Sequence, residues 1–423
     1  METLVVHQIE EHMTKSCIRD HNGEVGFTLT EVMVATMMTA AILLAGFGAL
    51  TVSQKTTRIT GQVSNTQATV RNALDMITAD LKLAGFGMQG MQGGAIGNCQ
   101  VNGVPTAIIP GDNNPAGADS GPDTISMVVP MTNSIPEGAV VDKLWQVAAG
   151  GPGLIGGANT PIANIPMPAN AVTGMGGTIP GGTAALVGMS VSLGGAAGSR
   201  IVGFGPGNQS LNLNPSIPSP IQFGNGTQVY LVQCITYEVV PPQDPLNLCQ
   251  GNAPCLVRGV GVVGAPNTPP RCNTAGSACV PIMDGVEDLQ LAYACDGCDP
   301  RINNAIADGQ VDDLNLSNTF DQGDFITDRN WFGTAAPFGD KMQPSTIRMV
   351  QVSIVARQTR TDQGMGEANQ VMVHSTAIPI VSDHNHATGV FVAGDNSTSA
   401  QQQSYFQFRR RLLTRTVELR NQR

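Results

Sequence analysis

The segment from residue 32 to residue 54 constrains this chain most, because none of its 23 residues is charged. A helix of that length rises about 35 Å, enough to cross a hydrocarbon core about 30 Å thick. No later stretch of the sequence combines this length with this apolarity. A secretory signal peptide, the alternative, has a shorter apolar run followed by a small-residue cleavage site. The segment therefore predicts a single membrane span that is retained as an anchor.

Directly before this segment the chain reads GFTLTE at residues 26–31. Together with the apolar helix, this motif resembles the class III signal of type IV prepilins and type II secretion pseudopilins. The resemblance implies that prepilin peptidase cleaves between Gly26 and Phe27 and that the new amino terminus, Phe27, is methylated. A carboxylate at the edge of a membrane helix costs a few kcal/mol unless it is paired or reaches the interface. The resemblance gives Glu31 such a partner, the cationic amino terminus of a neighbouring subunit; an interfacial Glu31 without a partner is the alternative.

Residues 1–26 would then be a leader peptide, and its charge departs from the usual pattern. It carries two basic and five acidic side chains, whereas prepilin leaders are normally short and basic. Positive charge on the cytoplasmic side normally sets membrane orientation, so the leader signals orientation poorly. A start at Met13 is the alternative, since it gives a shorter leader of balanced charge.

Beyond Lys55 the helical pattern continues, because apolar residues recur at helical spacings along one stripe. These residues are Val63, Val70, Leu74, Ile77 and Leu81. We expect one helix over residues 27–84, with its first half in the membrane and its second half packed under a globular head. Gly46 and Gly48 are points where it could bend, and Gly85-Phe86-Gly87 should end it.

The composition after the helix indicates a turn-rich, mostly β protein. Charged residues make up only 13% of the chain, against about 25% in typical proteins, and there are 50 Gly and 27 Pro. Such a chain suits neither a helical bundle nor charge-rich disorder. The net charge of −10 argues against nucleic-acid binding, and 4% aromatic residues argue against a large stacking platform.

Runs of β-branched or alternating apolar residues, separated by turn clusters, predict antiparallel strands. The candidates are 123–130, 139–147, 184–193, 227–240, 255–264, 284–294, 345–357, 371–381 and 404–419. The predicted fold class is α+β, a long amino-terminal helix packed on an antiparallel sheet with a glycine-rich loop insertion. Between residues 144 and 238 the one charge before Glu238 is Arg200. We expect extended loops and short irregular strands there; a flexible linker between two domains is the alternative.

Five motifs in the carboxy-terminal half sharpen the resemblance. They are TYEVV (236–240), CLVRGV (255–260), MDGVEDLQLAYACDG (283–297), STIRMVQVSIVARQ (345–358) and RRRLLTRTVELRN (409–421). In this order they resemble the PilW-type minor pilins of type IV pili, over residues 27–90 and 227–423. The implied organisation is a leader (1–26), a membrane and assembly helix (27–54), an amphipathic helix (55–84), a Gly/Pro-rich region (85–226) and a disulfide-bearing β head (227–423).

The resemblance implies a non-enzymatic minor pilin in a tip complex that primes pilus assembly. Its partners would be other minor pilins, the major pilin, prepilin peptidase and the inner-membrane assembly machinery. The protein would cross the inner membrane once with its head in the periplasm, and later stand at the pilus tip. Two alternatives stay open: a tip adhesin, for which the long insertion argues, and a minor pseudopilin of type II secretion.

Eight of the nine cysteines follow the leader, which contains Cys17. An even number in an exported domain indicates disulfides, although eight cysteines allow 105 pairings. Proximity along the chain suggests Cys249–Cys255, Cys272–Cys279 and Cys295–Cys298, which leaves Cys99–Cys234. The Cys-x-x-Cys spacing at 295–298 also fits a redox motif, but polar turn residues follow it where a helix would be needed.

Other candidate sites lack the context that their chemistry needs. Two G-x-G-x-x-G matches, at 85–90 and 259–264, do not lie between a strand and a helix. The His-x-His pair at 384 and 386 has no fixed third ligand nearby. A calcium loop at 296–313 would use Asp296, Asp299, Asn303, Asp308, Asp312 and Asp313, but the spacing is not that of an EF-hand. We therefore expect no enzyme activity, no cofactor and no metal.

The last fifteen residues contain six arginines and one acidic residue, Glu418. On a strand, Arg409, Arg411 and Arg415 would share one face. That face would meet acidic groups of neighbouring subunits, or it would be the solvated face of an edge strand that charge protects from aggregation.

Overall fold

The fold was analysed in a computed structural model of the chain. It describes residues 26–86, 99–101, 104–111, 121–130, 145–146, 154–155, 162–166, 186–194, 197–208, 210–219, 221–224, 226–242, 246–249, 253–260, 271–272, 278–298, 307–326, 344–358, 408 and 410–420. Cys17, the predicted strand 371–381 and the histidine pair at 384 and 386 lie outside these residues.

One helix, α1 (Leu29–Leu83), runs without a break through Gly46 and Gly48. The predicted helix over 27–84 agrees with it to within two residues at each end. It ends at Gly85, whose φ of 75° lies in the left-handed region that favours glycine at helix ends. The Gly85 N–H donates to the carbonyl oxygen of Val128 at 3.0 Å, which ties the helix end to the head.

The larger sheet has ten antiparallel strands built around one long strand, β12 (Gln228–Val240). Its main path follows the order β14-β13-β12-β8-β9-β10-β7. These strands are β14 (Ala278–Asp284), β13 (Cys255–Val260), β8 (Ser190–Leu193), β9 (Ala197–Phe204), β10 (Ser210–Ile217) and β7 (Ile162–Pro166). Also paired with β12 are β4 (Thr124–Pro130), which carries β3 (Ile108–Gly111) on its other edge, and β5 (Trp145–Gln146).

A second sheet has three antiparallel strands in the order β15-β16-β17. Its strands are β15 (Val286–Cys295), β16 (Ile347–Arg357) and β17 (Arg410–Glu418). Two short pairs complete the described strands: β1 (Gln100–Val101) with β2 (Val104–Pro105), and β6 (Leu154–Ile155) with β11 (Phe223–Gly224). The fold is thus the predicted α+β class, with a long apolar helix at the amino terminus and antiparallel sheets after it.

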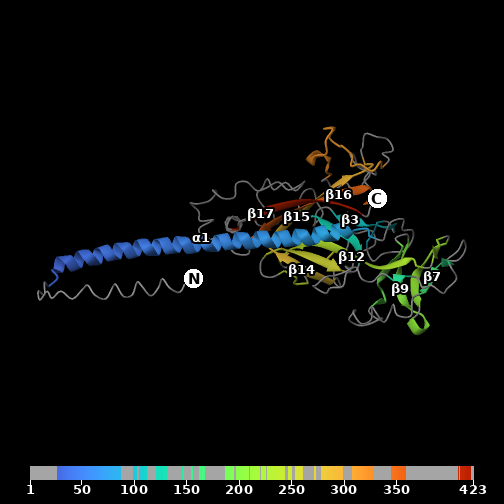
Figure 1. Cartoon of the computed structure of the whole chain (residues 1–423), viewed down its shortest axis with the longest axis horizontal. Helices are drawn as coiled ribbons and strands as arrows, with labels where there is room; N and C mark the ends of the chain where they lie inside the picture. Colours follow the sequence, from blue (N-terminus) through green and yellow to red (C-terminus); the bar gives the residue numbers. More distant parts are fainter. Residues whose placement is uncertain are drawn as a thin grey trace, which may run out of the picture. The chain divides into compact units, whose positions relative to one another are not determined.

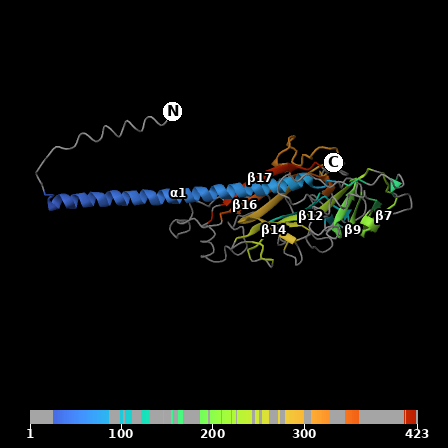
Figure 2. The same cartoon turned by 60° about the horizontal axis from the view of Figure 1, so that its bottom comes forward.

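Residues 62–83 of α1 belong to the same compact unit as the head and supply the centre of its core. Val70, Leu74, Ile77 and Leu81, four members of the predicted stripe, are at most 3% exposed. They pack with buried residues of both sheets in one continuous cluster. Figures 1 and 2 show this part of the helix beside β17 and β14. One side of the helix is buried against two sheets, and this explains why apolar residues recur at helical spacing in the sequence.

The glycine-rich region is more regular than the sequence predicts. Strands β9 and β10 are eight residues long each, and with β7 and β8 they extend the large sheet beyond β12. They enclose a separate apolar core: Ile162, Ile165, Leu186, Val191, Leu193, Ala197, Ile201, Leu211, Leu213, Ile217, Phe223, Val229 and Leu231. Alternate apolar residues such as Leu211 and Leu213 face this core. Burial of every second side chain therefore favours strands here, even though the many glycines favour turns.

A single residue, Gly285, connects the two sheets, because β14 ends at Asp284 and β15 begins at Val286. Its φ is 80°, and a Cβ built there would stand 2.7 Å from the backbone oxygen of Arg357. Its own N–H and carbonyl bond to Pro254 and Arg357, both at 2.7 Å. Neither the backbone conformation nor the surrounding space accepts a side chain.

We therefore expect Gly285→Ala to lower the free energy of unfolding by about 2 kcal/mol, through left-handed strain plus displaced backbone. Gly309→Ala is the matched control, since Gly309 has φ 93° but nothing within 4 Å of the added Cβ. Urea unfolding should show a clearly larger loss of unfolding free energy for Gly285→Ala than for Gly309→Ala. Equal losses of unfolding free energy would contradict a steric role for Gly285.

Candidate functional site at the helix start, the helix anchor and the disulfides

The predicted cleavage motif lies at the start of α1. Gly26, Phe27 and Thr28 precede the helix, and the Phe27 side chain is 85% exposed. Thr28 and Glu31 form a capping box: the Thr28 N–H donates to Glu31 Oε2 at 3.1 Å, and the Glu31 N–H donates to Thr28 Oγ1 at 3.3 Å. The T-x-x-E spacing is legible in the sequence, where we had not assigned it. The carboxylate is thereby held at the positive end of the helix dipole.

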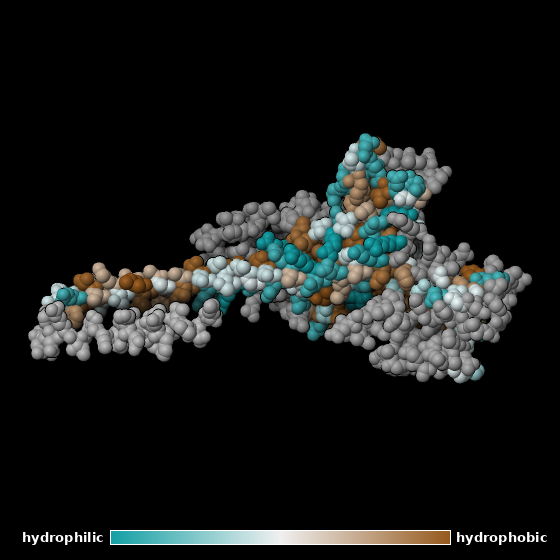
Figure 3. Space-filling view, in the orientation of Figure 1, coloured by the Kyte–Doolittle hydropathy of each residue, from teal (hydrophilic) through white to brown (hydrophobic). Residues whose placement is uncertain are grey.

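The first part of α1 presents apolar side chains outward. Thirteen large apolar side chains in this part are each at least 50% exposed. They are Phe27, Leu29, Val32, Met33, Val34, Met37, Met38, Ile42, Leu43, Leu44, Phe47, Leu50 and Val52. Figure 3 shows brown, hydrophobic residues along this stretch. The helix is long and apolar enough to cross a membrane, and its most apolar window has no buried residue. A single amino-terminal helix of this kind suggests membrane anchoring.

The second half of α1 is fixed to the large sheet through Asp80. Its Oδ2 accepts a hydrogen bond from the Tyr237 hydroxyl and another from Arg258 Nε at 2.8 Å. The Tyr237 side chain is fully buried in β12, and the Asp80 and Arg258 side chains are 15% and 23% exposed. Burial, with the Asp80 charge as a second cause, raises the pKa of Tyr237 far above its usual value. Tyr237 therefore stays a hydrogen-bond donor at every physiological pH.

Two of the carboxy-terminal arginines, Arg410 and Arg415, pair with acidic groups within the chain. Strand register places Arg411 and Arg415 opposite Ala356 and Val352, so they share a face as predicted. Arg415 pairs with Asp75 of α1 in an exposed contact, a kind of pair that contributes little to stability. Arg409 lies outside the described residues.

A buried ion cluster that we did not predict links the three strands of the smaller sheet. Arg410 reaches Glu287 through two nitrogens, at 2.5 and 3.1 Å, and Arg357 Nη1 lies 3.2 Å from the same carboxylate. The Glu287 side chain is completely buried. Two arginines thus pair with one buried carboxylate, and the Arg410 contact joins β17 to the start of β15.

All eight cysteines after the leader form disulfides: the three pairs that proximity along the chain suggests, and the Cys99–Cys234 pair that these leave over. The pairs are Cys99–Cys234, Cys249–Cys255, Cys272–Cys279 and Cys295–Cys298. The first closes a loop of 135 residues, whereas the others span seven residues or fewer. Bridges of this kind are typical of exported domains.

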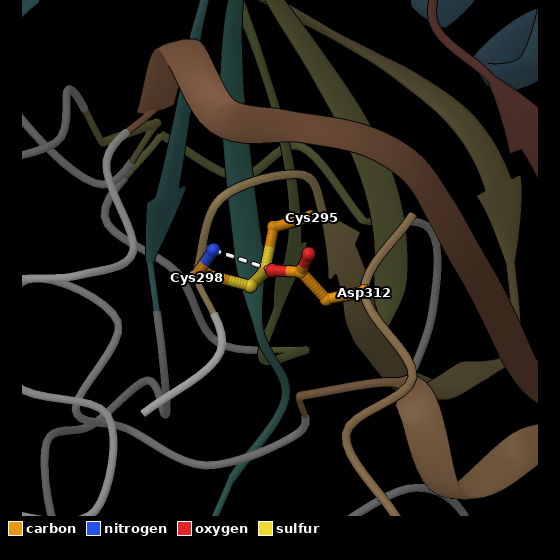
Figure 4. A group of neighbouring side chains, drawn as sticks. All are labelled: Cys295, Cys298 and Asp312. Atoms are coloured by element: carbon orange, nitrogen blue, oxygen red, sulfur yellow. Dashed lines mark hydrogen bonds between the residues drawn. A yellow bond between two sulfur atoms is a disulfide. The ribbon is translucent and has the colours of Figure 1, made fainter. Parts of the chain in front are cut away.

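Cys295, Cys298 and Asp312 form the one group of three potential metal ligands among the described residues (Figure 4). Both sulfurs are consumed by the disulfide, so they are not thiolate ligands. The Asp312 carboxylate instead accepts the Cys298 N–H at 2.5 Å, and the Asp312 N–H donates to the Cys295 carbonyl at 2.9 Å. The disulfide and these two hydrogen bonds hold the loop around Asp312 against the end of β15.

The acidic loop at 296–313, which we considered and rejected as a calcium loop from its spacing, is organised in the same way. Asp296 accepts the N–H groups of Asp308 and Gly309 at 2.9 and 3.1 Å, and it also pairs with Arg348 at 3.1 Å. Asp299 and Asn303 lie outside the described residues. Asp308, Asp312 and Asp313 likewise accept backbone N–H groups, so they act as turn-forming acceptors.

In the comparison with known proteins, one family model matches part of the chain. Residues 251–421 match the model of the family described as Type IV Pilus-assembly protein W. The matched region runs from just before β13 to the end of β17, and it includes the Arg357, Arg410 and Glu287 cluster. No curated protein and no solved structure matches the chain. The family match supports a type IV pilus-related protein with a role in pilus assembly.

Proposed function

We propose that this chain is a minor pilin of a type IV pilus that joins a tip complex and helps to initiate assembly. The family match over residues 251–421 carries the proposal, because the same chain has the GFTLTE motif at residues 26–31, followed by an apolar helix. Minor pilins act by assembling with other subunits, so the proposed role needs no catalytic group. Its partners would be other minor pilins, the major pilin and the inner-membrane assembly machinery.

In this proposal α1 has two consecutive tasks. Its exposed apolar part holds the subunit in the inner membrane, with the disulfide-bonded head in the oxidising periplasm. Prepilin peptidase removes residues 1–26, and the amino group of Phe27 is methylated. During assembly the apolar part leaves the lipid and packs among the helices of other subunits. The subunit then stands at the pilus tip on the cell surface.

Mass spectrometry of the protein in sheared pili tests the processing step. We expect the chain to begin at Phe27 with a methylated amino group. A chain that keeps residues 1–26, or that is missing from purified pili, would contradict the proposal. Deleting the gene should remove surface pili while protein secretion stays intact. Normal pili with failed secretion would instead indicate a type II secretion pseudopilin.

The Glu31 carboxylate should be essential for incorporation because an apolar helix bundle contains little water to solvate the cationic amino terminus of a neighbour. Glu31→Gln removes the charge while glutamine can still complete the capping box. Truncating a buried, hydrogen-bonded charge pair costs about 2–5 kcal/mol, so we expect at least about a tenfold loss of incorporation into pili.

Immunoblots of sheared pili and of membranes measure this loss. Thr28→Ala is the matched control, because it removes the cap and keeps the charge, and it should reduce incorporation far less. Normal incorporation of Glu31→Gln together with a loss in Thr28→Ala would assign Glu31 a role in helix capping alone.

A second candidate function, a tip adhesin, is favoured by the sheet region of β7 to β10. This region has its own apolar core and lies outside the family match. If it binds a surface, replacing exposed residues on β9, such as Val202 and Arg200, should abolish attachment without lowering the number of pili.

A further inference from the structure

The segment 307–326 lies in the long connection between β15 and β16, and backbone hydrogen bonds hold its end against the three-stranded sheet. It returns through Ile326, whose N–H and carbonyl both bond to Tyr293 of β15, at 2.8 and 2.9 Å. Leu314 packs against the main core. In Figures 1 and 2 the orange segment stands out from the sheet.

The interior of the segment is braced by carboxylates that accept backbone N–H groups. Asp324 is fully buried and accepts from Leu314 and Asp321, both at 2.8 Å. Asp313 accepts from Ser317 at 3.1 Å and from Asn318 at 2.7 Å. These bonds fix the backbone on both sides of residue 316.

The backbone so fixed holds the Leu316 side chain in solvent and leaves the Phe320 ring about half exposed beside the Phe325 ring. Leu316 is 67% exposed and Phe320 is 48% exposed. Leu316 has φ 64°, a left-handed conformation that leucine rarely adopts, and Asn318 has φ 62°. A leucine at an exposed left-handed position improves neither the local backbone nor the core, so its presence there calls for a role outside this chain's own folding.

The surroundings of this apolar pair are strongly acidic. Residues 307–326 contain Asp308, Asp312, Asp313, Asp321 and Asp324 and no Lys or Arg. Figure 3 shows hydrophilic and hydrophobic residues side by side on this protruding segment. Negative charge disfavours nucleic acid and anionic lipid as ligands. It also disfavours a second copy, because residues 27–423 have 20 Lys and Arg against 27 Asp and Glu, a net charge of −7.

We propose that Leu316 and Phe320 form a docking tip that enters an apolar pocket rimmed by Lys or Arg on a different protein. The tip is pre-organised, so little conformational entropy is lost on binding, and the surrounding aspartates supply electrostatic complementarity. The inference goes beyond the proposed function, since any basic-rimmed partner satisfies it.

Site-specific photocrosslinking in the producing cells tests the docking tip. A photoreactive phenylalanine analogue replaces Thr319, an exposed residue between the two anchors. We expect one major product with a different protein, and mass spectrometry should locate the link in an apolar segment flanked by Lys or Arg. Leu316→Asn keeps a residue that tolerates left-handed φ and removes the apolar anchor. It should lower the yield about tenfold, as loss of a central anchor does.

Phe320→Ser should lower the yield as well, whereas Val280→Thr, which changes an exposed apolar residue on β14, should not. Unfolding curves of Leu316→Asn should match the parent, so a lost product reflects lost contact. The proposal is overturned by no product above background, by a product with lipid or with a second copy, or by a yield that Leu316→Asn leaves unchanged. Pilus number does not enter this readout, so failure here is distinct from failure of the minor-pilin proposal.

Discussion

Replacing both Cys99 and Cys234 with alanine will destabilise the head more than removing any other disulfide. The bridge closes a 135-residue loop, for which chain-entropy arguments give about 5 kcal/mol of stabilisation. The Cys249–Cys255 bridge closes a loop of only six residues, for which the same argument gives about 2 kcal/mol. Sequence separation alone therefore predicts a large difference between the two double variants.

The position of the Cys99–Cys234 bridge adds to this effect. Both cysteines are buried with Ile109, Val128 and Val232 in a small apolar cluster on β3, β4 and β12. The bridge thus ties residue 99, which follows the end of α1 along the chain, to the central strand of the large sheet.

Urea unfolding of the full chain in detergent, followed by tryptophan fluorescence, measures both losses. The Cys249→Ala, Cys255→Ala variant is the control, because it also replaces two buried sulfurs near β12 and β13. Similar midpoints for the two double variants would mean that the long loop is already restricted in the unfolded chain.

Asp80→Ala is expected to release the second half of α1 from the large sheet. The substitution removes the acceptor of Tyr237 and the counter-charge of Arg258, both of which are largely buried. Removing one member of a buried ion pair costs about 3–5 kcal/mol, because the remaining charge keeps its desolvation cost without a partner. The buried Tyr237 hydroxyl adds a further unsatisfied donor.

Asp75→Ala is the matched control, since Asp75 lies on the same helix and also pairs with an arginine. That pair is exposed, with 62% of the Asp75 side chain accessible, so its loss should cost less than about 1 kcal/mol. Limited proteolysis after Lys82 and urea unfolding should separate the two variants. Equal stability of Asp80→Ala and Asp75→Ala would show that apolar packing alone holds the helix.

Much of the architecture was legible in the sequence because it depends on local patterns. The charge-free run and the stripe through Val70, Leu74, Ile77 and Leu81 predicted α1 and its buried face. Strands β4, β12, β15 and β16 were predicted to within about two residues at each end, because their apolar runs are long and bounded by turns. By contrast, β14 was missed because Pro281 and exposed residues interrupt its pattern.

The candidate site also has features that local sequence patterns predict and others that only the tertiary structure shows. The motif at residues 26–31, the apolar helix and three of the cysteine pairs follow from spacing along the chain, and the Cys99–Cys234 pair is what these three leave over. The Asp80–Tyr237–Arg258 contact and the Glu287–Arg357–Arg410 cluster join residues that lie 157, 178 and 123 positions apart in their hydrogen bonds. Nothing in one sequence says which distant charges will meet, since a buried ion pair is chosen by the packing of the elements that carry it.

The sequence by itself thus determined that the chain has one apolar helix, an antiparallel β head and paired cysteines, because helix period, strand alternation and short loop closure are local properties. The tertiary structure alone decided that the glycine-rich region extends the large sheet and that Leu316 stands exposed on a braced loop. Both outcomes depend on long-range contacts: β12 offers an edge on which β8 can form, and buried Asp324 holds the loop that carries Leu316.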